Sequence, residues 1–208
     1  MAHGQADDML TTVTLAATCP KLIAPAMNTH MLENQITQDN LKTLEHYGFT
    51  VIPSGSGMLA CGDVGSGRLP DEGVLVDYVL RELACAKDLK GKKVVVSAGA
   101  TQEPMDPVRY LTNHSTGKMG YAVARAAAMR GADVTLIHGP TALPPVKFTE
   151  DVPITTAQDM YEAVTSRFAD MDILVMAAAV ADYRPATVAD DKIKKKDGDL
   201  SIPVERTA

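Results

Sequence analysis

The clearest pattern of apolar positions lies in the second half of the chain, where short strand-like runs alternate with helical stretches. Two β-branched runs, residues 94–98 and 133–138, flank an alanine-rich stretch with helical spacing over 117–130. This order predicts a βαβ unit with a long first connection. A helix over 158–169 and a strand over 172–178 are expected to follow. Right-handed crossovers would give a parallel sheet of about three strands that is covered on both faces.

The first part of the chain shows a weaker version of the same alternation. We expect short strands over residues 21–24 and 49–52, with one helix over 29–47 between them. Residues 53–70 contain five glycines and two prolines, which predicts a long loop. A helix is expected over 71–86.

A polar, lysine-rich junction over residues 87–93 separates the two parts. We therefore expect two domains, residues 1–88 and 89–208. A chain of 208 residues is long enough for one large or two small domains.

Residues 97–120, SAGATQEPMDPVRYLTNHSTGKMG, form the most informative segment. They are rich in Gly, Ser, Thr and Asn and end where a helix begins, and free N–H groups at a helix N-terminus bind anions. The segment predicts a phosphate or nucleotide site. The alternative without function is an ordinary glycine-capped loop.

Two familiar nucleotide motifs do not fit. A dinucleotide fold needs its glycine fingerprint directly after the strand and an acid at the end of the second strand, where this chain has His138-Gly139-Pro140. A P-loop needs Ser or Thr after Gly117-Lys118, but Met119 stands there. An NAD(P)-dependent oxidoreductase is therefore only an alternative hypothesis.

Composition narrows the class of protein. Hydrophobic residues make up 46% of the chain but aromatic residues only 4%, so Ala, Val, Leu, Ile and Met must build the core. The net charge of −6 argues against a general role at nucleic acids or membrane surfaces. Three cysteines with no C-x-x-C pair fit a reducing compartment, and no apolar run approaches the roughly 20 residues of a membrane span. We expect a cytoplasmic protein.

Longer motifs resemble known families. Residues 106–120, DPVRYLTNHSTGKMG, resemble a signature of phosphopantothenate–cysteine ligases, and residues 178–185 and 192–195 resemble the next two ligase signatures. Residues 25–31, PAMNTHM, and 57–69, GMLACGDVGSGRL, resemble the flavin-dependent phosphopantothenoylcysteine decarboxylases. The two activities occur together in bacterial bifunctional enzymes of coenzyme A biosynthesis.

The resemblance implies an α/β protein in two parts. The C-terminal part of a flavoprotein-like decarboxylase domain would precede a Rossmann-like parallel-sheet ligase domain. Both domains are expected to be incomplete, as in an internal fragment whose activity is impaired. The longer protein is expected to be a homo-oligomer, and a non-catalytic binding subunit that keeps the fold is the second alternative.

For the ligase part, the resemblance implies that 4′-phosphopantothenate and L-cysteine are joined with CTP and Mg²⁺ through an acyl-cytidylate. Asn113 and Lys192 are the catalytic candidates, and Arg109 and Asn113 bind substrate. Asp182 is the expected Mg²⁺ ligand. The lysine run, residues 192–196, is expected to be a mobile flap. The nucleotide-binding candidates are Gly99, Ser115, Thr116, Gly117, Lys118, Ala178, Ala179, Asp182, Lys192 and Lys195.

For the decarboxylase part, the resemblance implies FMN chemistry that yields 4′-phosphopantetheine, with most of the flavin site outside this chain. Asn28 would bind the substrate carboxylate, together with Met31, and Cys61 would protonate an enethiol intermediate. Each assignment has a purely structural alternative. Asn28 can cap a helix, Cys61 can be a small buried apolar side chain, and the lysine run can be a solvated face.

Overall fold

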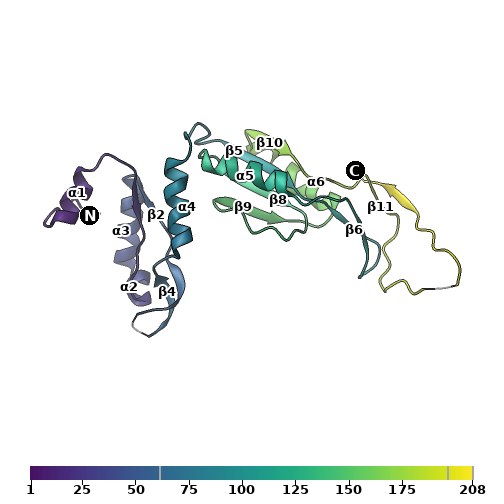
Figure 1. Cartoon of the computed structure of the whole chain (residues 1–208), viewed down its shortest axis with the longest axis horizontal. Coiled ribbons are helices and arrows are strands. Elements are labelled where there is room, and N and C mark those ends of the chain that lie inside the picture. Colours follow the sequence, from purple (N-terminus) through teal and green to yellow (C-terminus); the bar gives the residue numbers. More distant parts are fainter. Residues whose placement is uncertain (61, 196, 208) are drawn as a thin grey trace. The chain divides into compact units, whose positions relative to one another are not determined.

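The computed structural model describes residues 1–60, 62–195 and 197–207. The chain divides into two compact units, Met1–Ala84 and Cys85–Ala208. Figure 1 labels their helices and strands in chain order. The two units are described separately.

A four-stranded parallel sheet forms the centre of the second unit, in the order β10-β5-β8-β9. Its strands are β5 (Lys93–Ala98), β8 (Asp133–His138), β9 (Thr149–Pro153) and β10 (Ile173–Met176). The expectation of about three strands was wrong, because β9 has no apolar alternation that a sequence pattern can reveal. It is an edge strand with exposed Glu150 and Asp151, and charged side chains are typical of sheet edges.

Helices cover both faces of this sheet, as the apolar pattern predicted. Alternate residues of β5 point to opposite faces, so Val96 packs against α5 (Lys118–Met129) and Val95 packs against α6 (Ala157–Thr165). The α5 helix lies very close to β5 at Gly120, where a Cβ atom would stand 2.5 Å from the Cβ of Ala98. Only glycine fits at that contact.

The predicted helix over 158–169 ends early. Thr156 caps α6, and its hydroxyl accepts a hydrogen bond from the N–H of Asp159 at 3.1 Å. The α6 helix stops at Thr165, and a short 3₁₀ turn, Phe168–Asp170, follows.

Two short hairpins extend the second unit beyond the sheet, and the sequence predicted neither. The long loop after β5 contains β6 (Gln102–Pro104) paired with β7 (Tyr110–Thr112). Further along, β11 (Tyr183–Pro185) pairs with β12 (Val204–Arg206). Figure 1 shows β6 and β11 close to each other, and the two strands are in contact.

The first unit contains a two-stranded parallel sheet, a hairpin and four helices among its described residues. The elements are α1 (Met9–Ala16), β1 (Lys21–Ile23), α2 (Thr29–Glu33), α3 (Gln35–His46), β2 (Phe49–Val51), β3 (Gly55–Met58), β4 (Val64–Arg68) and α4 (Glu72–Leu83). None of the helices in the described part of the chain has the length and apolar character needed to span a bilayer.

Two predictions for the first unit were wrong. The single helix expected over 29–47 is interrupted at Asn34, whose side-chain oxygen accepts the N–H of Ile36 at 3.0 Å and starts a new helix. The loop expected over 53–70 contains the β3–β4 hairpin. Its glycines hide the strand pattern, because a strand without side chains has no apolar alternation.

The cores of the two units differ in extent. The buried apolar residues of the first unit's described part are Leu44, Ile52 and Leu59, and its α1 helix buries none. The second unit contains two clusters of buried apolar side chains, one on each side of the sheet. Its core is therefore the main source of packing energy in the described chain.

We predict that Leu136→Ala lowers the unfolding free energy of the second unit by about 2–5 kcal/mol, since a buried leucine leaves a cavity. Leu136 is 0% exposed, whereas Leu200 is 60% exposed in the same unit. Leu200→Ala is the matched control and should change this energy by less than about 0.5 kcal/mol. Hydrogen exchange of β8 amides in increasing denaturant measures both. Equal losses in the two variants would contradict the assigned core.

Candidate functional site

The site in the second unit is built on residues 177–182, which follow β10 and which we name the strand-end segment. The hydroxyl of Ser97, at the end of β5, accepts hydrogen bonds from the first two N–H groups of this segment, at 3.1 and 3.2 Å. The hydroxyl of Thr101 accepts the N–H of Ala181 at 3.0 Å. Both hydroxyl residues are fully buried. They fix the backbone of the segment against the sheet.

Further bonds hold the middle and the end of the strand-end segment. The carbonyl of Gly99 accepts the N–H of Ala179 at 2.7 Å. Thr207 donates its hydroxyl to the carbonyl of Ala181 at 2.6 Å and its N–H to that of Asp182 at 3.0 Å. Most peptide groups of this segment thus have a defined partner in the protein.

Asn113 joins the long loop to the same segment. Its amide nitrogen donates to the carbonyls of Ala179 and Val180, at 3.3 and 3.2 Å. Among the described residues, no group donates to its Oδ1 atom. The exposed side chain therefore combines a structural contact with an acceptor that a ligand can reach.

Two glycines bring the long loop to the start of α5. Gly99 and Gly117 both have positive φ angles, 77° and 76°, which favour glycine. A Cβ atom on Gly117 would lie 3.2 Å from the Cα and N atoms of Gly99. Gly117 is the N-cap of α5 and supplies no side-chain cap, so N–H groups of the first turn remain available to an anion. Thr116 and Lys118 are exposed beside them, and Ser115 is half-buried.

Asp182, the predicted metal ligand, is exposed at the end of the strand-end segment. No group of three or more His, Cys, Asp or Glu side chains suitable for a metal lies within the described residues. A single carboxylate fits Mg²⁺ when substrate phosphates and water complete the shell, which is the usual arrangement for this ion. Asp182 alone does not form a resident metal site.

Arg109 lies beside the lysine run rather than beside the strand-end segment. It forms an ion pair with the buried carboxylate of Asp106 at 2.7 Å, and it donates to the carbonyl of Ile193 at 2.5 Å. Burial alone would raise the pKa of Asp106, but three backbone N–H groups and Arg109 lower this pKa to about 2. Arg109, residues 192–195 and residues 197–200 border a cavity of about 740 Å³.

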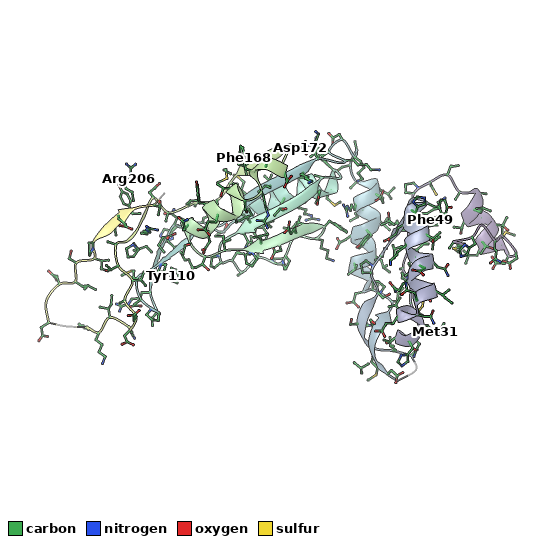
Figure 2. The ribbon with its side chains drawn as sticks, turned by 180° about the vertical axis from the view of Figure 1, so that it is seen from behind. Met31, Phe49, Tyr110, Phe168, Asp172 and Arg206 are labelled. Carbon is green, nitrogen blue, oxygen red and sulfur yellow. The ribbon has the colours of Figure 1, made fainter. Side chains whose placement is uncertain are left out.

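In the first unit, Asn28 has the helix-capping role that was its structural alternative. Its side-chain oxygen accepts the N–H of His30 at 2.9 Å. It also borders a cavity of about 400 Å³ together with Met58 and Gly67 of the hairpin. The capping bond thus leaves Asn28 at the border of the cavity, and its role toward a substrate stays a prediction. Met31 is exposed, extends from α2 in Figure 2 and does not line this cavity.

The β3–β4 hairpin is held against the segment that carries Asn28. Met27 donates its N–H to the carbonyl of Gly67 at 2.9 Å, and Thr29 donates its hydroxyl to the carbonyl of Ser66 at 2.7 Å. A Cβ atom on Gly67 would lie 2.1 Å from the carbonyl oxygen of Met27, so this contact excludes any other residue. Cys61, the predicted proton donor, lies outside the described residues.

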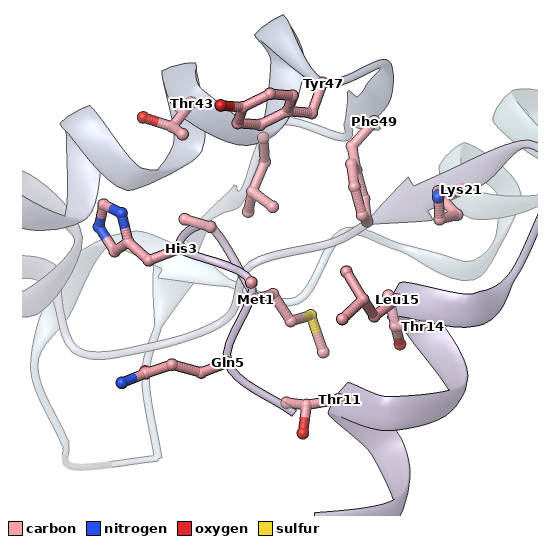
Figure 3. A pocket seen from close by; sticks show the side chains of 13 residues that line it. Met1, His3, Gln5, Thr11, Thr14, Leu15, Lys21, Thr43, Tyr47 and Phe49 are labelled. Carbon is pink, nitrogen blue, oxygen red and sulfur yellow. The ribbon is translucent and has the colours of Figure 1, made fainter. Parts of the chain in front are cut away.

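A different cavity of the first unit lies away from all predicted site residues. It has a volume of about 540 Å³ and lies between the N-terminal segment, α1 and α3 (Figure 3). Lys21 lies over the ring of Phe49 at its wall, 4.8 Å from the ring centre. This cavity contains no cluster of groups that suggests chemistry.

The structure brings together several predicted residues and adds others. Gly99, Asn113, Gly117, Ala178, Ala179 and Asp182 converge around the carboxyl ends of β5 and β10, whereas Lys192 and Lys195 border the separate 740 Å³ cavity. Sequence reasoning missed Ser97, Thr101 and Asp106. The signal for the first two is a hydroxyl residue at the end of an apolar strand, where α/β sites form.

Comparison with known proteins identifies two family matches. Residues 89–208 match the family described as DNA/pantothenate metabolism flavoprotein C-terminal domain, and residues 1–84 match the family described as Flavoprotein. The first-unit match ends at residue 84, where the first structural unit also ends, and the other match begins at residue 89, within the second unit.

Two relatives are similar over nearly the whole chain. The coenzyme A biosynthesis bifunctional protein CoaBC of Bacillus subtilis is 48% identical over 210 residues, which cover 100% of this chain and 52% of that protein. The Escherichia coli protein of the same name is 45% identical over 196 residues, covering 94% of this chain and 48% of that protein. The chain spans about half the length of these curated relatives.

Solved structures resemble part of this chain. The C-terminal domain of a coenzyme A biosynthesis bifunctional protein CoaBC is 44% identical, with a TM-score of 0.52, and covers 59% of this chain and 57% of that one. A Cab2 mutant in complex with phosphopantothenate-cysteine has a TM-score of 0.51 at 18% identity, covers 64% of each chain, and shows the shared fold alone.

We predict that Ser97→Ala destabilises the second unit by about 1–3 kcal/mol, because the part-buried N–H groups of Ala177 and Ala178 lose their acceptor. Ser166→Ala is the control, since the Ser166 hydroxyl is exposed, donates to the carbonyl of Ala163 and accepts Nη1 of Arg167 at 3.5 Å in an exposed contact. Denaturant unfolding followed by circular dichroism measures both. A Ser97→Ala loss no larger than that of Ser166→Ala would refute the role given to this hydroxyl.

Proposed function

Because the chain belongs, through residues 89–208, to the family described as DNA/pantothenate metabolism flavoprotein C-terminal domain, we propose that its second unit joins 4′-phosphopantothenate to L-cysteine with CTP. The observation that carries this proposal is the strand-end segment. Its backbone is fixed by Ser97, Thr101 and Asn113 next to the open N-terminus of α5. Such a place, at the carboxyl ends of parallel strands, is where α/β folds bind nucleotides.

The reaction would proceed in two balanced steps. The carboxylate of 4′-phosphopantothenate attacks the α-phosphorus of CTP, a new P–O bond forms, and pyrophosphate leaves as the original phosphoanhydride bond breaks. The amine of cysteine then attacks the acyl carbon, loses a proton and displaces CMP. Negative charge develops on oxygen in both steps, so fixed donors and cations are the groups that accelerate them.

Residues around the strand-end segment have clear roles in this scheme. The small side chains of Ala178 and Ala179 let the nucleotide approach the backbone closely. The phosphates would lie at the start of α5, near Gly99, Ser115, Thr116, Gly117 and Lys118. Asp182 would hold Mg²⁺ jointly with these phosphates.

Asn113 would act through both ends of its amide. Its nitrogen keeps Ala179 and Val180 in place, and its Oδ1 atom accepts no hydrogen bond from the described residues. Its amide would stabilise the anionic oxygens of the acyl-cytidylate. Lys192 and Lys195 of the lysine run would contribute positive charge. Arg109, which lies beside the lysine run, would bind substrate.

The first unit is proposed to take part in decarboxylation of the ligated product to 4′-phosphopantetheine. Its match to the Flavoprotein family supports FMN as the cofactor, which supplies the redox chemistry when bound. Asn28 borders the 400 Å³ cavity, where its amide would bind the substrate carboxylate, and Met31 would contact substrate. Cys61 would donate the proton. A cytoplasmic homo-oligomer of the relatives' length would carry both activities.

The residues at the end of β8 do not favour the alternative hypothesis of an NAD(P)-dependent oxidoreductase. His138 occupies the position of the ribose-binding acid, and its Nδ1 atom lies 2.8 Å from the carbonyl of Gly139. A non-catalytic subunit would keep the same fold without turnover. The two tests below separate these alternatives from the ligase.

We predict that the chain binds Mg-CTP in preference to NADH. The fixed strand-end segment and the exposed Asp182 favour a triphosphate with its metal, and no acid follows β8 to bind a ribose. Isothermal titration with each nucleotide, with and without Mg²⁺, measures the preference. Tight NADH binding without any response to Mg-CTP would overturn the assignment.

We also predict that Asn113→Asp lowers ligase turnover by about a hundredfold or more, the usual effect of losing one preorganised group at a developing anion. The new carboxylate would face the carbonyls of Ala179 and Val180 in place of two donors. Pyrophosphate release with 4′-phosphopantothenate, cysteine and CTP measures turnover, in a protein of the relatives' length.

The matched control for that experiment is Asn34→Asp. Asn34 caps α3 in the first unit, and Asp is an equally good capping residue. The control should retain turnover. Unchanged turnover in Asn113→Asp would remove Asn113 from the mechanism.

A further inference from the structure

Asp106 is one of two acidic side chains that are buried in the described part of the second unit, the other being Glu103. Asp106 is only 3% exposed, yet backbone N–H groups of Val108, Ile193 and Arg109 and the Arg109 side chain lower its pKa to about 2. Its Oδ1 atom accepts the N–H groups of Val108 and Arg109, both at 2.8 Å. Its Oδ2 atom accepts Nε of Arg109 at 3.0 Å. The carboxylate thus organises the turn that joins β6 to β7.

The same two side chains also hold a residue that lies more than 80 positions further along the chain. Oδ2 of Asp106 accepts the N–H of Ile193 at 3.1 Å, and Nη2 of Arg109 donates to the carbonyl of Ile193 at 2.5 Å. The backbone N–H and the backbone carbonyl of Ile193 are therefore both hydrogen-bonded to these side chains. One further bond fixes the approach to this point, from the N–H of Ala189 to the carbonyl of Met105 at 3.0 Å.

Ile193 stands between lysines that are exposed. Its own side chain is half-buried, whereas Lys192, Lys194 and Lys195 lie in solvent around the 740 Å³ cavity. Among the described residues, none of these three lysines has an acidic partner. The lysine segment, residues 192–195, is thus held by its backbone at one point while its charged side chains remain unpaired.

We propose that Asp106 and Arg109 form a backbone clamp that positions the lysine segment for a polyphosphate ligand. The clamp fixes Ile193 and leaves the lysines on either side of it free to turn toward an anion. Asp106 is a positioning residue in this scheme and does not touch the ligand. The nature of the ligand rests on the proposed function, whereas the clamp itself does not.

The pairing of these two residue types explains why one clamp can hold both backbone groups. A carboxylate accepts an N–H, a guanidinium donates to a carbonyl, and the planar fork of arginine can bind the carboxylate and the carbonyl at once. A lysine at 109 keeps the charge but loses the fork. An asparagine at 106 keeps an acceptor but loses the charge.

Limited trypsin digestion of this chain tests the clamp, because trypsin cuts after lysine and cleavage of a folded chain reports local opening. We expect Asp106→Asn to raise the rate of cleavage after Lys192, Lys194 and Lys195 by about tenfold or more, the scale of one lost charge-assisted hydrogen bond. Mass spectrometry assigns each cut.

Asp172→Asn is the matched control. Asp172 also accepts a backbone N–H, that of Lys93 at 2.9 Å, and pairs with Lys92 at 2.9 Å. It lies at the opposite end of the second unit from Tyr110, the neighbour of Arg109 (Figure 2). The control should leave cleavage of the lysine segment unchanged. An equal rise in both variants would mean general loosening and would overturn the clamp.

Arg109→Lys provides a second variant if Asp106→Asn does not fold. It should raise cleavage at the lysine segment while the unfolding midpoint stays near that of the Asp172→Asn control. Unchanged cleavage in every folded clamp variant would refute the proposal.

Trypsin digestion in the presence of a nucleotide distinguishes failure of the clamp from failure of the proposed function. Mg-CTP should slow cleavage of the lysine segment in the unsubstituted chain, and NADH should not. If Mg-CTP gives no protection but Asp106→Asn still accelerates cleavage, the clamp stands and the ligand assignment falls. If Mg-CTP protects and Asp106→Asn has no effect, the ligand assignment stands and the clamp falls.

Discussion

The second unit depends on the hydrogen bonds that tie the strand-end segment to the end of β5. A chain that leaves a sheet carries unpaired N–H and carbonyl groups, and buried groups of this kind must find partners. Here the buried hydroxyls of Ser97 and Thr101 accept three of the N–H groups, and the carbonyl of Gly99 accepts a fourth. The segment therefore has one conformation before any ligand arrives, so ordering it costs little on binding.

The fold determines why these partners meet. In a parallel sheet the strands end on the same side, so the end of β5 and the end of β10 are neighbours, and Ala100 pairs with Ala179 just beyond them. Helix α5 approaches the same place closely because Gly120 lies against Ala98. The long loop after β5 is tied to the strand-end segment by the bonds that Asn113 donates to Ala179 and Val180. A second contact of the same kind, between Asp106, Arg109 and Ile193, ties the lysine segment to the β6–β7 turn.

The sequence predicted the elements whose apolar residues repeat regularly. β5 and β8 were visible as short, mostly apolar and β-branched runs, and α5 was visible because its buried side chains recur with a period near 3.6 residues. The edge strand β9 was not visible because it has no apolar alternation. The hairpins were not visible because their strands are short or, in β3 and β4, rich in glycine. Motifs indicated Asn113 and Asp182, but Asp106 was missed because the contact that defines its role lies with Ile193. A lone sequence does not reveal such long-range pairs.

The most direct test of this account is amide hydrogen exchange in the strand-end segment, followed with and without Mg-CTP. The account predicts slow exchange at Ala177, Ala178 and Ala181 in the free chain, because their N–H groups are bonded to buried hydroxyls. Mg-CTP should slow this exchange further, and NADH should not. Exchange as fast as in an open loop, together with no response to Mg-CTP, would contradict both the fixed segment and the nucleotide site built on it.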